Sequence, residues 1–318
     1  MSRRRFLLRR LIMLVGSLLV ASFVIFGSMY LAPGSALSVL TGGRALPASS
    51  LAVLEQRYHL NSPFLVQYWY WITGVLHGDL GISVEWRENV TALIGNLTWT
   101  TAGLVLYASV IILILGIGLG LLAGLKPGLL DTSTLVVTAL TAALPAFVAS
   151  MALIAVFAVK LGWFPAPPGN GIGLADHLKH FTLPAIALAI SSLAIVARVT
   201  RASIREEAGR EHVQTAISRG IPYRLIARKH ILRNAAIPIT TIVGITIASL
   251  IAVDAVVETA FSLNGLGAQL VKSANDKDVA VVQAISLILV TAFVLVNMVV
   301  DFLYAWLDPR VSLGTQAQ

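Results

Sequence analysis

The chain alternates between long apolar runs and shorter polar segments. About 20 mostly apolar residues cross the hydrocarbon of a bilayer, and six runs approach or exceed that length: residues 11–32, 100–125, 133–161, 181–197, 237–261 and 281–304. The pattern therefore predicts an all-α integral membrane protein with six transmembrane helices, forming one transmembrane domain over residues 1–318. No small-residue cleavage site cleanly follows the first run, so we interpret it as a retained span and not as a signal peptide.

Composition supports a membrane protein and excludes several kinds of reactive and metal-binding site. Only 12% of the residues are charged and 57% are hydrophobic, whereas soluble domains carry about a quarter charged residues. The absence of cysteine excludes disulfides, thiolate metal sites and cysteine nucleophiles. The six histidines lack an HExxH spacing. His177 and His180, close to Asp176, are the one candidate for an external metal site, and we predict no metal there.

The distribution of lysine and arginine predicts how the spans are oriented. With both termini in the cytoplasm, 16 of the 23 basic residues fall on the cytoplasmic side and seven fall outside, as the positive-inside rule requires. Residues 33–98 then form an extracytoplasmic region, and residues 198–236 form a cytoplasmic loop. The net charge of +8 follows this topology, so it does not indicate nucleic-acid binding.

The extracytoplasmic region 33–98 is rich in Trp and Tyr, which anchor at membrane interfaces. Within it, residues 61–63 (NSP) have the polar cap and the proline that are typical of a helix start. We therefore expect short helices in this region, some of them lying at the membrane surface with lipid as their partner.

The cytoplasmic loop 198–236 is far longer than a turn between two spans requires. It carries nine basic residues against three acidic ones, and residues 220–222 (GIP) divide it. Ser203 followed by Glu206 matches a capping box and predicts a helix start. Apolar or small residues then recur at helical spacing: Val213, Ala216, Ile217 and Gly220. The loop is interpreted either as a helix lying on anionic lipid or as a docking surface for a cytoplasmic protein.

Residues 214–220 (QTAISRG), followed by Arg228, residues 232–235 and Pro238, resemble the cytoplasmic EAA loop of ATP-binding-cassette (ABC) importer permeases. More narrowly, the chain resembles the B-type permease of dipeptide, oligopeptide and nickel importers. The resemblance covers nearly the whole chain, because similar short elements recur in order, from residues 31–34 after the first span to residues 307–311 near the end.

The resemblance implies a type I ABC importer permease fold and a role for the loop. Residues 210–221 would contain the coupling helix, which is seated in a cleft of a cytoplasmic ATPase, and Gly220 would permit the sharp turn after it. The residues implicated in coupling are Arg210, His212, Val213, Gln214, Ala216, Ile217, Arg219 and Gly220.

The same resemblance implies the partners of the chain. These are a second homologous permease subunit, two cytoplasmic ABC ATPases and an extracytoplasmic substrate-binding protein, in the plasma (inner) membrane of a bacterium or archaeon. ATP and magnesium would be bound by the ATPases, so this chain is expected to hold no cofactor and to perform no chemistry. Peptides are the expected cargo, and nickel chelates or haem-like compounds are the alternative within the family.

The sequence departs from the family pattern at a few positions. Gln214 and Thr215 stand in place of the Glu and Ala that name the loop, as is usual in this subfamily. Ser35 replaces an Asp that often follows the first span, and Asp254 occupies a stretch that is usually small and apolar. These last two departures bear on the cargo and leave the class of protein unchanged.

Asp254 lies midway along the fifth predicted span, four residues before Glu258, so the two carboxylates share a helix face. An acid at the centre of a span costs about 2.5–3.5 kcal/mol on insertion scales, so it should face a partner or water. One interpretation is that Asp254 and Glu258 line the translocation path and contact a cationic group of the cargo. The other is a hydrogen bond to a neighbouring helix or to the second subunit.

Four glycines in the second predicted span contain two overlapping small-xxx-small spacings: Gly116, Gly118, Gly120 and Gly124. Such spacings allow the backbones of two membrane helices to approach closely. The second span is therefore predicted to pack tightly against a neighbouring helix.

Three other classes of protein compete with an importer permease. An ATP-independent secondary transporter usually shows internal repeats and paired ionisable residues within the membrane, but no repeat is visible and only Asp254 is clearly central. An intramembrane enzyme would need a catalytic pair, and the chain has neither a GxSxG nor an HExxH motif. A channel or receptor scaffold that merely docks a cytoplasmic partner remains the third alternative.

Overall fold

The computed structural model describes residues 3–31, 41, 47–57, 59–165 and 174–307. These residues form helices joined by turns, and the one β interaction among them is an isolated antiparallel bridge between Ile82 and Asn89. The chain divides into two compact units. The first consists of residues 1–10, 103–262 and 295–318, and the second of residues 11–102 and 263–294. The all-α fold predicted from the sequence is confirmed for the described residues.

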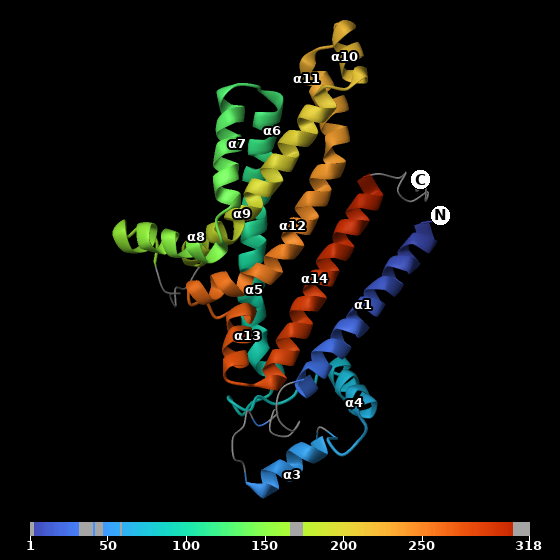
Figure 1. Ribbon diagram of the computed structural model, residues 1–318, viewed down its shortest axis with the longest axis vertical. Helices are drawn as coiled ribbons and strands as arrows, with labels where there is room; N and C mark the ends of the chain where they lie inside the picture. The colour runs from blue at the N-terminus through green and yellow to red at the C-terminus, as the bar shows by residue number, and fades with distance from the viewer. Residues whose placement is uncertain (1–2, 32–40, 42–46, 58, 166–173, 308–318) are drawn as a thin grey trace. The chain divides into compact units, whose positions relative to one another are not determined.

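Five helical stretches are long and apolar enough to cross a membrane (Figure 1). Two of them lie within single helices near the ends of the chain, Leu8–Tyr30 in α1 (Arg3–Leu31) and Val279–Phe302 in α14 (Val279–Leu307). A third, Leu178–Ala208, lies in α9 (Leu174–Ala208). The other two each contain a π-helical turn. These are Val90–Leu125, built from α5 (Val90–Ile111), η1 (Ile112–Gly116) and α6 (Ile117–Leu125), and Tyr223–Ala260, built from α11 (Tyr223–Ile226), η3 (Ala227–Ile231) and α12 (Leu232–Ala260).

The third predicted span is divided by a sharp bend. Helix α7 (Leu129–Ala142) and the stretch Ala146–Lys160, which comprises α8 (Ala146–Leu153) and η2 (Ile154–Lys160), meet at 102°. Pro145 causes the break, because proline lacks an amide hydrogen for the helix and drives the residue before it out of the helical region. The predicted six spans are therefore obtained when the bent pair is counted as one.

Helix α9 lies at the centre of the first unit, where it packs against α6, α7, α8 and α12. The glycines of the second span allow this packing. A Cβ atom placed on Gly116 would lie 3.2 Å from Val196, and one on Gly124 would lie 2.7 Å from Ile204. At Gly120 a Cβ atom would lie 2.6 Å from the carbonyl oxygen of Ala197. The predicted close approach of a neighbouring helix is thus confirmed, and α9 is that neighbour.

The second unit contains α3 (Ala48–Arg57), α4 (Phe64–Leu76) and α13 (Leu266–Asn275), together with the adjoining parts of α1, α5 and α14. Its core joins α5, α13 and α14 through Val90, Ile94, Leu266, Val281 and Ile285. The buried carboxylate of Asp278 holds the preceding loop in place, since it accepts hydrogen bonds from the Ser83 hydroxyl and from the backbone N–H of Glu85 (3.2 Å). The short helices predicted in region 33–98 are present as α3 and α4.

Candidate functional site

The loop between α9 and α12 folds around a two-turn helix, α10 (Glu211–Ser218). Figure 1 shows α10 beyond the end of the hairpin that α9 makes with α11 and α12. The capping box at Ser203 and Glu206 predicted a helix start, and this prediction is wrong. Both residues lie inside α9, which continues to Ala208, because the core packing of α9 extends through Ile204 into the loop.

The end of α10 is determined by Gly220. Its φ of +72° lies in the left-handed region, which glycine adopts without a Cβ penalty. The amide of Gly220 bonds the carbonyl oxygen of Ile217 (2.9 Å), and the amide of Ile221 bonds that of Ala216 (3.2 Å). This pair of bonds is the Schellman arrangement, which satisfies the last carbonyls of a helix. The sharp turn predicted at Gly220 is therefore present.

Helix α10 has a buried face and an exposed face. Val213 is 1% exposed and Ala216 is 6% exposed. Both lie in one apolar cluster with residues of α9, α11, η3 and α12: Ile204, Ile226, Ile231, Ala235 and Ile239. Their side chains therefore hold α10 against its own chain and are not available to a docked protein.

The other six residues implicated in coupling face solvent. The side chains of Arg210, His212, Gln214, Ile217 and Arg219 are exposed, as is Gly220. Ile217 is 46% exposed, and it is the one large apolar side chain of α10 on this face. Ile217 therefore presents an apolar side chain among polar ones at the tip of the hairpin.

Glu207, one of the three acids of the loop, anchors it, a role that the sequence pattern did not predict. One oxygen of this buried carboxylate forms an ion pair with Arg210 Nε (2.8 Å), and the other accepts a hydrogen bond from Asn234 Nδ2 (3.3 Å). It thereby ties the end of α9 to the start of α10 and to α12. The three-residue spacing to Arg210 was a local signal for the first contact, but nothing local indicated Asn234, which is 27 residues away.

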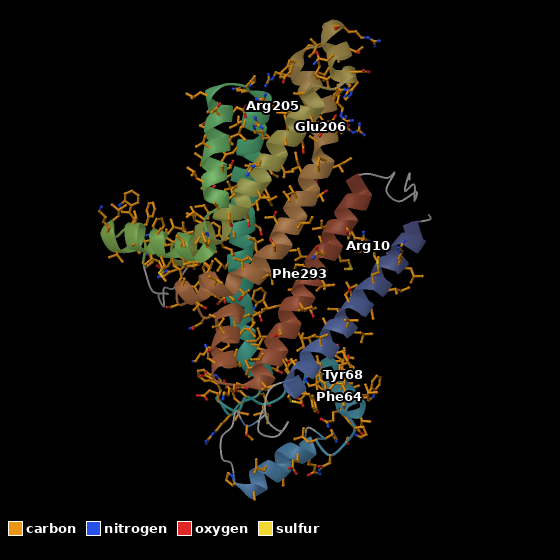
Figure 2. All side chains as sticks on the ribbon, in the orientation of Figure 1. Arg10, Phe64, Tyr68, Arg205, Glu206 and Phe293 are labelled. Atoms are coloured by element: carbon orange, nitrogen blue, oxygen red, sulfur yellow. The ribbon has the colours of Figure 1, made fainter. Side chains whose placement is uncertain are left out.

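A second charged cluster joins α7 to α9 and was also missed from the sequence. Asp131, in the first turn of α7, forms an ion pair with Arg201 and another with Arg205 (Nη2 to Oδ2, 2.6 Å). Arg201 contributes two hydrogen bonds, from Nε and from Nη2 (3.0 Å). Figure 2 shows Arg205 and Glu206 along α9 as it approaches the loop. The two arginines are one helical turn apart, so they reach the same carboxylate.

The two acids of α12 do not lie on an exposed surface. Asp254 is 1% exposed and Glu258 is fully buried. Neither carboxylate oxygen of Asp254 has a hydrogen-bond partner among the described residues. The shared helix face predicted from their spacing is present, because both lie in α12 at positions i and i+4. A direct contact with a passing ligand would require an opening that this conformation does not have.

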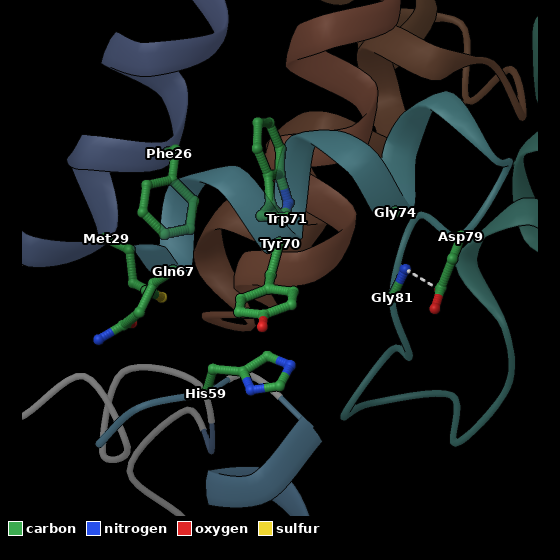
Figure 3. Close-up of a pocket in the computed structure, with 9 residues that line it drawn as sticks. All are labelled: Phe26, Met29, His59, Gln67, Tyr70, Trp71, Gly74, Asp79 and Gly81. Carbon is green, nitrogen blue, oxygen red and sulfur yellow. Dashed lines mark hydrogen bonds between the residues drawn. The ribbon is translucent and has the colours of Figure 1, made fainter. Parts of the chain in front are cut away.

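A pocket of about 230 Å³ lies in the second unit, between the end of α1, helix α4 and the turn that follows it (Figure 3). Phe26, Met29, Tyr70 and Trp71 make most of its wall, and the ring of His59 stacks on Tyr70 at 3.9 Å between centroids. Two polar side chains of the lining, Gln67 and Asp79, are already hydrogen-bonded. The amide of Gln67 binds the Tyr30 hydroxyl and the carbonyl oxygens of Leu60 and Ser62, and Asp79 accepts the Gly81 amide.

The described residues contain no group of three or more His, Asp or Glu side chains arranged to hold a metal. His180, one of the two candidates named from the sequence, bonds the carbonyl oxygen of Asp176 within its own helix (2.8 Å). That bond engages the ring, and the prediction of no metal stays a prediction.

The chain is similar in sequence to known components of membrane transport systems. A family model described as binding-protein-dependent transport system inner membrane component matches residues 116–313, and a model of the N-terminal part of the same component matches residues 3–94. Glutathione transport system permease protein GsiC of Salmonella typhimurium is 34% identical over 310 residues, covering 96% of this chain and 98% of the relative. Oligopeptide transport system permease protein OppB of the same organism is 33% identical over 309 residues, covering 96% and 99%. GsiC of Escherichia coli K12 is 32% identical over 307 residues, covering 96% and 98%.

Proposed function

The chain belongs to the family of binding-protein-dependent transport system inner membrane components, and from this premise we propose that it is one of two permease subunits of an ATP-driven importer for peptides. Its similarity to a glutathione permease and to an oligopeptide permease supports peptide-class cargo, because glutathione is itself a small peptide. Nickel chelates or haem-like compounds are the alternative cargo within the family.

The partners in this proposal are a second homologous permease, two cytoplasmic ATPases and an extracytoplasmic binding protein. The ATPases bind ATP and magnesium, and this chain contributes half of the path and performs no chemistry. Both termini and residues 198–236 lie in the cytoplasm, while residues 33–98 lie on the side where the binding protein delivers cargo. This orientation follows from the excess of basic residues on the cytoplasmic side.

The observation that carries the proposal is the two-sided construction of α10. Its exposed face, with His212, Gln214, Ile217 and Arg219, is free to enter a cleft of an ATPase. Its buried face is packed into the cluster that α9 and α12 share. A displacement of α10 by the ATPase is therefore passed directly to two spans, because close-packed interiors transmit strain.

Replacing Ile217 by aspartate tests the docking surface. The substitution puts a charge where an apolar side chain would be buried by the ATPase, so we expect the amount of ATPase that copurifies with the permease to fall at least about tenfold, equivalent to about 1.4 kcal/mol. ATP-driven uptake into proteoliposomes should fall with it. Because Ile217 is half exposed in the subunit, the folding of the permease itself should be preserved.

Leu129→Asp is the matched control for that experiment. Leu129 is 86% exposed at the start of α7, away from α10, so the same apolar-to-acidic change there should leave copurification and uptake intact. Retention of the ATPase and of ATP-driven uptake by Ile217→Asp would contradict the docking role. Solute movement without any ATPase would favour an ATP-independent secondary transporter instead.

The buried acids of α12 give a separate prediction. Asp254→Asn keeps the shape of the side chain and adds a donor beside Glu258, and the burial of Asp254 keeps the site away from cargo. We therefore expect normal protein levels and uptake within about twofold of the unchanged protein, since a small energetic effect of about 0.4 kcal/mol corresponds to a twofold change. Uptake assays at matched protein level decide the point. A loss of uptake of tenfold or more would indicate that Asp254 does line the translocation path.

A further inference from the structure

Helix α4 carries two apolar faces, and one of them is already occupied. Phe64, Tyr68 and Trp71 pack against the end of α1. The ring centroid of Phe23 lies 5.5 Å from that of Phe64 and 5.2 Å from that of Tyr68, and both pairs have edge-to-face geometry. Figure 2 shows Phe64 and Tyr68 beside the end of α1. This face fixes α4 to the first span.

The second apolar face of α4 is left mostly uncovered by the described residues. Its positions follow the helical spacing i, i+4, i+7 and i+11, so at about 100° per residue they lie in a stripe about 60° wide. The stripe consists of Leu65, Trp69, Ile72 and Leu76. Leu65, Trp69 and Leu76 are 66%, 65% and 78% exposed. A helix facing water would carry charged residues at these positions, and α4 contains none along its 13 residues.

The polar side chains beside the stripe are satisfied within the helix. The Thr73 hydroxyl donates to the carbonyl oxygens of Trp69 (2.8 Å) and Tyr70 (3.0 Å). His77 Nδ1 bonds the carbonyl oxygen of Thr73 (2.7 Å). A polar group without a hydrogen bond is costly away from water, so these internal bonds suit a helix that meets little water on this side.

The contacts with α1 place α4 at a definite depth. The first span ends at Tyr30, and α4 packs on Phe23, Phe26 and Tyr30. At a rise of 1.5 Å per residue, these positions lie within about 10 Å of the end of the span. The neighbouring surface of α1 is also apolar and exposed, at Val20 and Val24. The stripe therefore continues a lipid-facing surface at the level where Trp and Tyr are enriched.

We propose that α4 is an interfacial anchor, whose stripe of Leu65, Trp69, Ile72 and Leu76 is embedded in lipid at the boundary between headgroups and acyl chains. Lipid covers this face, and burial of its apolar side chains alone holds the helix in the membrane. Interfacial helices that select anionic lipid carry Lys or Arg on their polar face, and α4 has neither. The helix thus fixes the external end of the first span to the membrane surface.

Spin labels at single cysteines test the proposal directly, because the chain has no cysteine of its own. Labels at Leu65→Cys, Trp69→Cys and Leu76→Cys in the complete transporter, reconstituted in lipid nanodiscs, are exposed to oxygen and to a water-soluble nickel complex. We expect the ratio of oxygen to nickel accessibility to shift strongly towards oxygen at all three positions. Val53→Cys on α3, at an equally exposed apolar residue (63%), is the matched control, and we expect it to lie in water because α3 also carries the charged residues Glu55 and Arg57.

Three results would overturn the proposal. Labels that match Val53→Cys would place the stripe in water. Labels protected from both reagents, as expected at the buried Met29→Cys, would mean that a protein, such as the second subunit or the binding protein, covers the face. The shift should also be equal in zwitterionic and anionic nanodiscs, and a shift seen only with anionic lipid would contradict insertion by apolar burial alone.

Discussion

Replacing Asp131 by leucine is expected to lower the free energy of unfolding by about 2–3 kcal/mol, somewhat less than for a fully buried ion pair, because part of the cluster contacts water. The loss arises because Arg201 and Arg205 would both keep their charge without their shared carboxylate. The thermal unfolding midpoint of the purified transporter, together with the abundance of the permease in membranes, measures the effect. We expect both to fall.

The matched control is Glu206→Leu. Glu206 is also an acid paired with an arginine, but the pair with Arg210 is exposed, so it contributes about 0–1 kcal/mol. Adding Arg201→Leu to Asp131→Leu should recover part of the lost stability, because one of the two unpaired charges is then removed. No recovery, or a stability of Asp131→Leu equal to that of Glu206→Leu, would mean that the cluster is not held together by its buried charge.

If α10 has the proposed coupling role, the cluster would bear on transmission of movement as well as on stability. Helix α9 runs without a break from the membrane to Ala208, just before α10. Asp131 couples α7 to α9 near that end, and Glu207 couples α10 and α12 to it. A movement applied at α10 by an ATPase would therefore be passed to α7 and α12 through charge-assisted contacts, and the apolar cluster around Ile204 would carry it as well.

The arrangement of spans was largely predictable, because bilayer thickness imposes a length that shows directly in the sequence. For this reason the run at 100–125 lies within the helical stretch Val90–Leu125, and the run at 281–304 lies within α14. The bend at Pro145 was the exception. Its proline was visible, but the apolar run around it continued on both sides, and apolar length alone does not distinguish a straight span from a broken one.

The loop over residues 198–236 was predicted as a segment but not in its details. Spacing predicted one apolar face on α10 from Val213, Ala216, Ile217 and Gly220. In the structure Val213 and Ala216 are buried against the chain, whereas Ile217 and Gly220 are exposed, a division that spacing alone does not show. The capping box failed because packing around Ile204, which involves residues distant in the sequence, determines how far α9 extends. The pairs of Asp131 with Arg201 and Arg205 join residues 70 and 74 positions apart, for which local periodicity carries no signal.

Replacing Gly120 by leucine is expected to lower the free energy of unfolding by about 3 kcal/mol, at the upper end of overpacking costs. This is similar to the effect expected for Asp131→Leu. A Cβ atom at this position would lie 2.6 Å from the Ala197 carbonyl oxygen and 2.5 Å from Thr200 Cβ. Neither neighbour is the end of a flexible side chain, so α6 and α9 must separate. The unfolding midpoint and the membrane abundance of the permease should both fall.

Gly118→Leu is the matched control on the same helix. It makes the same substitution two residues away, where a Cβ atom meets nothing within 4 Å, so we expect a change within about 0.5 kcal/mol. The comparison separates helix contact from helix propensity, because both substitutions remove a flexible glycine and only one pushes α9 away. Equal stability of the two variants would show that the close approach of α6 to α9 is not what holds the first unit together.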